Sequence, residues 1–83
     1  MKTIIFTYRA SKGLDRLPDD IQKRVTDALV EYAMHGNGDI KQLSGRPGYR
    51  LRVGSYRVIF SEDQTTILAI YIGTRSTDTY KRN

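Results

Sequence analysis

Residues 49–60 run YRLRVGSYRVIF and contain the clearest fold signal in the chain. Apolar or aromatic side chains alternate with arginine on both sides of Gly54-Ser55, and a two-residue loop with glycine first is typical of a type II′ hairpin. The pattern predicts antiparallel strands at 49–53 and 56–61. Because side chains alternate between the two faces of a strand, one face should pack against the core with Tyr49, Leu51, Val53, Tyr56, Val58 and Phe60.

The opposite face of this hairpin would carry Arg50, Arg52 and Arg57. The predicted register places Arg52 directly across from Arg57, where like charges destabilise a strand pair. A solvated outer face would account for one arginine, but folding alone gives no reason for three that converge. We therefore interpret this cluster as a functional site.

The first half of the chain predicts a strand followed by two helices. Residues 3–8 are β-branched and aromatic, as expected of a strand. Ser11 is a candidate N-cap for a short helix that ends before Pro18. A second helix should begin at Pro18, because two aspartates follow it and suit the positive end of the helix dipole, and should stop at Gly36.

The second half predicts strands. Residues 37–48 contain several glycines and are expected to form mostly a loop. In residues 66–72 the side chains of both faces are apolar, as expected of a central strand that is covered on both faces. The element order is then β-α-α-β-β-β. We expect an α+β fold in which a helical hairpin packs on a largely antiparallel four-stranded sheet, with residues 1–83 forming one domain.

Composition narrows the classes of function. The 83 residues include no cysteine and one histidine, which leaves no basis for a disulfide framework, a zinc site or a serine-type triad. A glycine-rich phosphate loop is also missing. The longest strongly apolar run, 67–72, is too short to span a bilayer, and the N-terminus lacks the features of a signal peptide. We therefore expect a cytoplasmic protein that uses no metal and no other cofactor.

The positive charge of the chain is unevenly distributed. Lysine and arginine number 14 against 9 acidic residues, which gives a net charge of +5. The segment from residue 41 to residue 57 has no acidic residue and these cations: Lys41, Arg46, Arg50, Arg52 and Arg57. A segment whose charged side chains are all positive indicates a polyanionic partner, with nucleic acid the first candidate. Arginine also suits bidentate contacts to phosphate.

The chain resembles the RelE-type toxins of the RelE/ParE superfamily over nearly its whole length. The matching segments are Leu43–Phe60, Ile72-Gly73-Thr74-Arg75, Tyr80, and the helical residues Leu17-Pro18 and Ile21-Gln22-Lys23. The resemblance implies a microbial-RNase-like fold and cleavage of mRNA in the ribosomal A site, by metal-independent attack of the neighbouring 2′-OH. It also implies neutralisation by a cognate antitoxin.

Site residues follow from the same resemblance. It implies catalytic roles for Arg50, Arg52, Arg57, Arg75 and Tyr80. The arginines, with Arg57 as the phosphate-binding one, would stabilise the extra negative charge of a phosphorane. Tyr80 would stack on a base or position the 2′-OH. Further contacts to RNA or the ribosome are expected from Lys41, Arg46, Lys81 and Arg82.

The chain departs from the family pattern in two ways. Some relatives have lysine at the positions of Arg50 and Arg52, and arginine holds its proton too firmly to act as a general base. Thr74 stands where relatives often carry histidine, which leaves His35 as the only imidazole. We place His35 at the C-terminal end of a helix, where it interacts with the dipole. Either Tyr80 or another group takes the proton, or the ribosome supplies much of the activation, so the general base and the general acid have no assignment.

Two other functions stay open. A ParE-like gyrase poison would share the fold but act by binding a protein, without hydrolysis, and such proteins usually lack the full set of basic residues and tyrosine. A non-catalytic module that binds nucleic acid or an antitoxin would need only the charge. The presence of all the candidate catalytic residues favours the nuclease over the poison.

Overall fold

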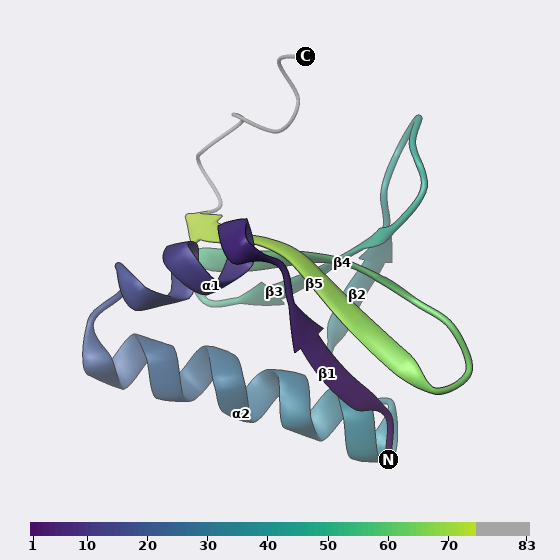
Figure 1. The fold of residues 1–83 in the computed structure, drawn as a ribbon, viewed down its shortest axis with the longest axis horizontal. Coiled ribbons are helices and arrows are strands. Elements are labelled where there is room, and N and C mark those ends of the chain that lie inside the picture. Colours follow the sequence, from purple (N-terminus) through teal and green to yellow (C-terminus); the bar gives the residue numbers. More distant parts are fainter. Residues whose placement is uncertain (75–83) are drawn as a thin grey trace.

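The computed structural model describes residues 1–74 and shows two helices on one face of a five-stranded sheet (Figure 1). The elements are β1 (Thr3–Phe6), α1 (Tyr8–Asp15), α2 (Asp19–His35), β2 (Asp39–Gln42), β3 (Tyr49–Val53), β4 (Tyr56–Glu62) and β5 (Thr66–Thr74). The strand order is β1-β5-β4-β3-β2, with β1 parallel to β5 and the other neighbours antiparallel. The predicted α+β class is confirmed. The following candidates lie outside the described residues: Arg75, Tyr80, Lys81 and Arg82.

The β3–β4 hairpin has the predicted register. Arg52 pairs with Arg57, and Tyr49 pairs with Phe60. Gly54 has a φ of 60° and the next residue has a negative φ, as a type II′ turn requires. The side chains expected on the core-facing side all belong to the hydrophobic core or pack against it. The hairpin prediction is confirmed, except that β4 extends one residue further, to Glu62.

A fifth strand, β2, lies where we expected a loop. It pairs with β3 at the edge of the sheet, with Asp39 opposite Arg52 and Lys41 opposite Arg50. Ile40 is its single apolar side chain, so the strand is too short and too polar to show an alternating pattern. The prediction of four strands is therefore wrong by one edge strand.

The first helix begins earlier than predicted. Thr7, not Ser11, is its N-cap, because the Thr7 hydroxyl accepts a hydrogen bond from the Ala10 amide at 3.1 Å. The same hydroxyl donates to the Ile70 carbonyl of β5 at 2.9 Å. This contact between residues far apart in the sequence ties the start of α1 to the sheet, and local sequence preferences do not include it.

The second helix has the predicted ends. It follows Pro18 directly, has two aspartates in its first turn, and stops at Gly36, whose φ is 74°. His35 lies in the last turn, with its Nδ1 atom 3.2 Å from Glu31 Oε2. The single histidine is therefore at a helix terminus, as expected.

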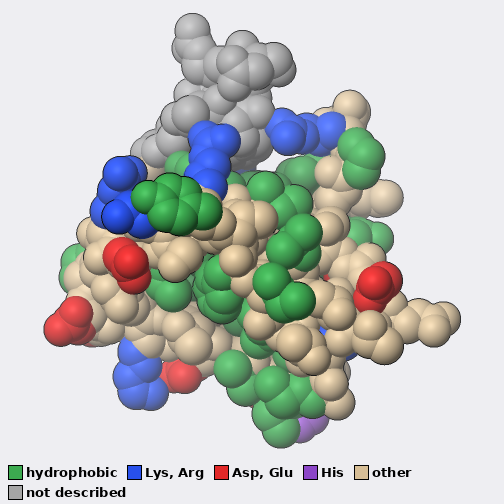
Figure 2. Space-filling view, in the orientation of Figure 1, with side chains coloured by type: hydrophobic (Ala, Val, Ile, Leu, Met, Phe, Trp, Pro, Cys, Tyr) green, Lys and Arg blue, Asp and Glu red, His purple; other side chains and the backbone are tan. Residues whose placement is uncertain are grey.

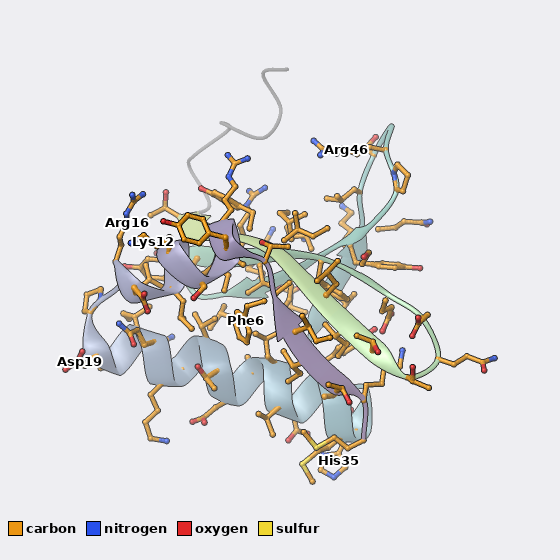
Figure 3. The ribbon with its side chains drawn as sticks, in the orientation of Figure 1. Phe6, Lys12, Arg16, Asp19, His35 and Arg46 are labelled. Atoms are coloured by element: carbon orange, nitrogen blue, oxygen red, sulfur yellow. The ribbon has the colours of Figure 1, made fainter. Side chains whose placement is uncertain are left out.

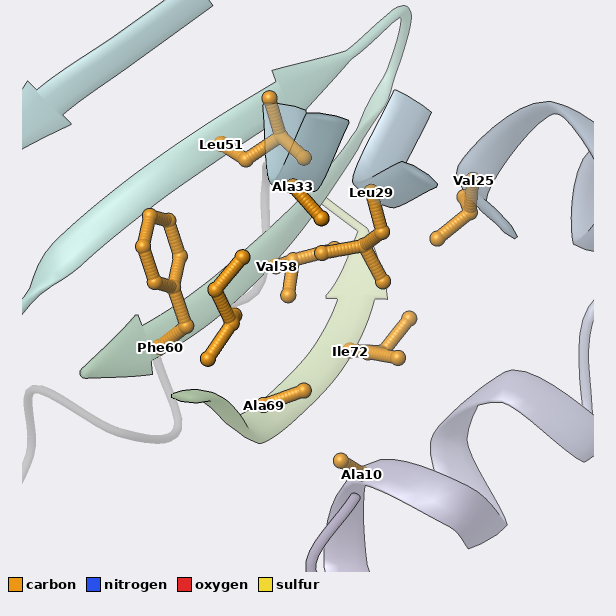
Figure 4. Packing of buried hydrophobic residues seen from close by; sticks show 10 residues of the cluster. Ala10, Val25, Leu29, Ala33, Leu51, Val58, Phe60, Ala69 and Ile72 are labelled. Carbon is orange, nitrogen blue, oxygen red and sulfur yellow. The ribbon is translucent and has the colours of Figure 1, made fainter. Parts of the chain in front are cut away.

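The core lies between the helices and one face of the sheet (Figure 4). Its buried residues are Ala10, Val25, Leu29, Ala33, Leu51, Val58, Phe60, Ile67, Ala69 and Ile72. The two helices run in opposite directions, and α1 packs mainly on β5 (Figure 1). A side chain at Gly13 would collide with the carbonyl oxygen of Ile72, so α1 lies unusually close to this strand.

The interior strand β5 is only partly covered on its second face. A register shift opposite Ile59 and Phe60 interrupts its alternation, and Ile70 is 37% exposed. Our expectation of a strand covered on both faces is therefore wrong at this position. On the core side the buried residues are Ile67, Ala69 and Ile72.

A polar cluster of Lys2, Tyr32 and Glu62 connects α2 to the sheet. Glu62 Oε1 accepts a hydrogen bond from Lys2 Nζ at 2.7 Å, and Oε2 accepts one from the Tyr32 hydroxyl at 2.6 Å. Burial raises the pKa of Glu62, but the hydrogen bonds from Lys2 and Tyr32 outweigh burial and hold the pKa below its ordinary value. Burial and the bond to Glu62 raise the pKa of Tyr32 to about 12.

We expect Glu62→Gln to lower the free energy of unfolding by about 1 kcal/mol at neutral pH, between the values for exposed ion pairs and for hydrogen bonds to buried charges. Because the folded state depresses the pKa of Glu62, its contribution is present above the unfolded pKa and is lost as the pH falls through the folded pKa. Urea unfolding curves of the parent and the variant should therefore converge in acid. A difference that stays constant down to low pH would show that the Glu62 charge is not its source.

Candidate nucleic-acid interface

The sheet face opposite the helices carries two rows of cross-strand partners. The first row runs from β2 to β5 as Lys41, Arg50, Ile59 and Tyr71. The second row runs from β2 to β5 as Asp39, Arg52, Arg57 and Gly73. Partners in register lie side by side on the same face. The three hairpin arginines therefore share one face, as predicted.

A groove of about 850 Å³ lies over the first row; we call it the central groove. Its cations are Arg9, Lys41, Arg46, Arg50 and Arg57. Within residues 1–74, no acidic side chain lines it. Its less polar side is formed by Ile59, Ile70 and Tyr71. The volume falls in the range of roughly 300–1,000 Å³ typical of ligand sites, so the central groove can hold a small anionic group together with an apolar or aromatic one.

Arg50 offers a donor to a ligand. The side chain is half-buried, and its Nε atom is buried without a hydrogen-bond partner among the described residues. Buried donors are nearly always paired with an acceptor in the protein, with water or with a ligand. The guanidinium also keeps its proton throughout the physiological range. Arg50 therefore combines a permanent charge with a donor that the described chain leaves unused.

Arg52 is set apart from the other two hairpin arginines. Its Nε atom lies 3.7 Å from Asp39 Oδ2, and its side chain does not line the central groove. Asp39 is the cross-strand partner that β2 supplies. The structure thus brings Arg50 and Arg57 together with the predicted RNA contacts Lys41 and Arg46, but does not bring Arg52 with them.

The prediction from the sequence did not include two residues of the central groove, Arg9 and Tyr71. The Arg9 guanidinium lies 5.3 Å from the centroid of the Tyr71 ring, a cation–π contact between α1 and β5. Arg9 was missed because we expected the helix to start at Ser11, which left Arg9 outside any element that faces the sheet. Tyr71 lies in an apolar strand, where its ring gave no signal apart from hydrophobicity.

Part of the positive charge of the molecule gathers beside this site. Figure 2 shows lysine and arginine side chains gathered along one edge, over α1 and the loop between β2 and β3, with most acidic side chains away from it. Lys12, Arg16 and Arg46 lie toward that edge, whereas His35 lies at the opposite end of the molecule (Figure 3). The imidazole is therefore remote from the central groove.

Within residues 1–74, no group of three or more His, Cys, Asp or Glu side chains could hold a metal ion. No helix in the same range is both long and apolar enough to cross a membrane.

The fold is shared with solved toxin–antitoxin structures. A chain of the RelB–RelE antitoxin–toxin complex from Methanococcus jannaschii matches with a TM-score of 0.77 and 25% identity, over 95% of this chain and 99% of that chain. A chain of a RelBE complex from Mycobacterium tuberculosis matches with a TM-score of 0.65 and 29% identity, over 89% and 98%. The isolated RelE toxin of E. coli has a TM-score of 0.76 at 20% identity, over 98% and 93%, which shows the fold alone.

Two helices on a mixed sheet, with arginines on the opposite face, define a toxin of the RelE/ParE superfamily. Residues 4–79 match the family described as the ParE toxin of type II toxin–antitoxin system, parDE. The chain therefore belongs to that family. Comparison with curated proteins gives no match.

Proposed function

We propose that this toxin is a ribosome-dependent endoribonuclease that cleaves mRNA and thereby inhibits translation. The observation that carries the proposal is the central groove, where five cations and, within the described residues, no acidic side chain surround an aromatic and aliphatic wall. Clustered arginines suit the oxygens of a phosphodiester, and the wall of Ile59, Ile70 and Tyr71 suits a sugar or base. A nucleotide of single-stranded RNA has both parts.

The proposed reaction is a metal-independent transfer within the RNA strand. The 2′-oxygen attacks the neighbouring phosphorus, and a bond from phosphorus to this oxygen forms as the bond to the 5′-oxygen breaks. The products are a 2′,3′-cyclic phosphate and a 5′-hydroxyl, so the proton lost from the 2′-OH is balanced by one gained at the 5′-oxygen. Arg50 and Arg57 would stabilise the negative charge that accumulates on the phosphorane.

Proton transfer needs a group outside the cations of the central groove. Arginine and lysine are protonated at neutral pH and cannot accept the proton of the 2′-OH. Either the ribosome supplies this group or Tyr80 does, as the family resemblance allows. Supply by the ribosome would account for the proposed dependence on it, whereas Tyr80 would act on naked RNA as well. Arg75 keeps its predicted catalytic role as a proposal, and Arg52, which lies outside the central groove, keeps a lesser one.

We also propose a cognate antitoxin as a partner in the cytoplasm. Chains with this fold occur in the RelB–RelE complexes of Methanococcus jannaschii and Pyrococcus horikoshii. An acidic antitoxin segment would complement the basic edge shown in Figure 2. Binding there would exclude mRNA from the central groove.

The family description favours a second candidate function, that of a ParE-like gyrase poison. A poison acts by binding its protein target and needs no phosphate at its site. It would therefore inhibit DNA supercoiling while leaving RNA intact. The arginines of the central groove would then contact acidic protein surface instead of phosphate.

We expect the purified protein to cut mRNA at discrete positions near the A site of programmed ribosomes and to cut naked RNA far less, because we expect the ribosome to supply the proton acceptor that the groove cations lack. Primer extension on the ribosome-bound mRNA measures the breaks. A supercoiling assay with DNA gyrase is run in parallel. Intact mRNA together with inhibited supercoiling would select the poison.

A further inference from the structure

A second groove adjoins the central groove along α1; we call it the α1 groove. Its volume is about 630 Å³, and its cations are Arg9, Lys12 and Arg16. These three residues are spaced by three and four positions, so their side chains lie on one face of the helix. Within the described part of the chain, no acidic side chain lines the α1 groove either.

An exposed tyrosine stands among these cations. Tyr8 is 80% exposed, and Lys12 Nζ lies 5.8 Å from the centroid of its ring. A single exposed ring is ordinary on a protein surface. The combination of a ring with flanking cations is different, because it is how proteins hold single-stranded nucleic acid: the ring stacks on a base while the cations contact phosphates.

The two grooves join at Arg9 and Tyr71, which line both. The Tyr71 ring lies over Gly73, where a side chain would collide with it, and the Arg9 guanidinium is 5.3 Å from the ring centroid. Tyr71 thus occupies the junction between the sheet face and α1. A polyanion that extends from the central groove in this direction next encounters the cations of the α1 groove.

We propose that the α1 groove binds the RNA next to the cleaved phosphodiester, with Tyr8 stacking on a base and Lys12 and Arg16 contacting phosphates. This inference rests on the proposed function and extends it. The substrate is a single-stranded segment of several nucleotides, held on both sides of Tyr71.

Binding of fluorescent single-stranded RNA, measured by anisotropy, tests the inference. An octanucleotide reaches both grooves, whereas a dinucleotide occupies the central groove. Tyr8→Ala should weaken octanucleotide binding about tenfold, the effect of losing one stacked base, while Tyr8→Phe retains it. Lys12→Gln combined with Arg16→Gln should lower the slope of log affinity against log salt by about 1.4, because each contact to single-stranded phosphate contributes about 0.7. Dinucleotide binding should change much less.

A charge-matched control comes from α2. Lys23→Gln combined with Arg24→Gln removes the same charge from exposed positions that line neither groove. This control should bind the octanucleotide nearly as the parent does. All variants are also tested for cleavage on programmed ribosomes.

The results separate this inference from the proposed function. If the Tyr8 and Lys12/Arg16 variants bind the octanucleotide like the parent, or the parent binds none, the inference is wrong, and cleavage by the parent still supports the nuclease. If the parent leaves ribosome-bound mRNA intact, both fail. If the Lys12/Arg16 variant keeps its affinity for RNA but loses affinity for an acidic antitoxin segment, the α1 groove is a protein contact and the inference is overturned.

Discussion

Replacing Arg57 with glutamine should slow cleavage of ribosome-bound mRNA by about 10²–10³-fold, the usual cost of removing one donor to a charged transition state. Arg57 lines the central groove and lies across the hairpin from Arg52. Relief of that like-charge pair should add roughly 0.2–1 kcal/mol to the free energy of unfolding. The variant should therefore be as stable as the parent, or slightly more stable, and yet cleave far more slowly. Single-turnover cleavage and urea unfolding measure the two quantities.

Arg52→Gln is the matched comparison for Arg57→Gln. It removes the same charge from the same face and relieves the same repulsion, but its side chain lies beside Asp39 and outside the central groove. We expect a markedly smaller loss of cleavage than for Arg57→Gln. Equal losses would mean that overall charge, and not position in the central groove, governs activity. A marked loss of stability on replacing Arg57 would make it a structural residue and remove it from the proposed site.

The hairpin was predictable because its information is local. Alternation on both sides of Gly54-Ser55 determined the register of Arg52 against Arg57, and the structure has that register. The same holds for α2, where Pro18 and Gly36 mark the two ends. In these elements the turn residues and the periodicity of the side chains agree, so no distant contact was needed to predict them.

The elements that were missed depend on contacts between distant parts of the chain. Strand β2 exists because its backbone pairs with β3, and its mostly polar side chains do not show this. Thr7 caps α1 locally by accepting from the Ala10 amide, and the same hydroxyl also donates to the Ile70 carbonyl more than sixty residues later. A hydrogen bond of that kind has no counterpart in a local sequence pattern.

The candidate site was predicted only in part, because some of its residues are placed by contacts between distant parts of the chain. Arg50 and Arg57 follow from the hairpin, and the sequence groups Lys41 and Arg46 with them. Arg9 reaches the central groove only because α1 starts at Tyr8 and packs on β5. The separation of Arg52 from the other arginines likewise depends on the unexpected strand that carries Asp39. Sequence reasoning thus found the cationic centre of the site but not its boundary.

The close packing of α1 on β5 gives the second large expected effect, for Gly13→Ala. In a free helix this change is favourable by about 1 kcal/mol, because alanine has the higher helix propensity. Here the new methyl group would collide with the carbonyl oxygen of Ile72, a backbone atom that cannot move without disturbing the sheet. We expect a net loss of about 1–3 kcal/mol, as for other overpacked sites. A chain of 83 residues has a total stability of roughly 4–12 kcal/mol, so this loss is a large fraction of it.

Urea unfolding of Gly13→Ala should show a lower midpoint at an unchanged slope, since the surface exposed on unfolding stays the same. Ser11→Ala is the control: it lies at an exposed position of the same helix, where alanine should be neutral or slightly stabilising. Cleavage by Gly13→Ala should fall as well, because displacing α1 from β5 moves Arg9 away from Tyr71. If Gly13→Ala is as stable as Ser11→Ala, α1 does not lie against Ile72, and the positions that we assign to Arg9 and the α1 groove are wrong.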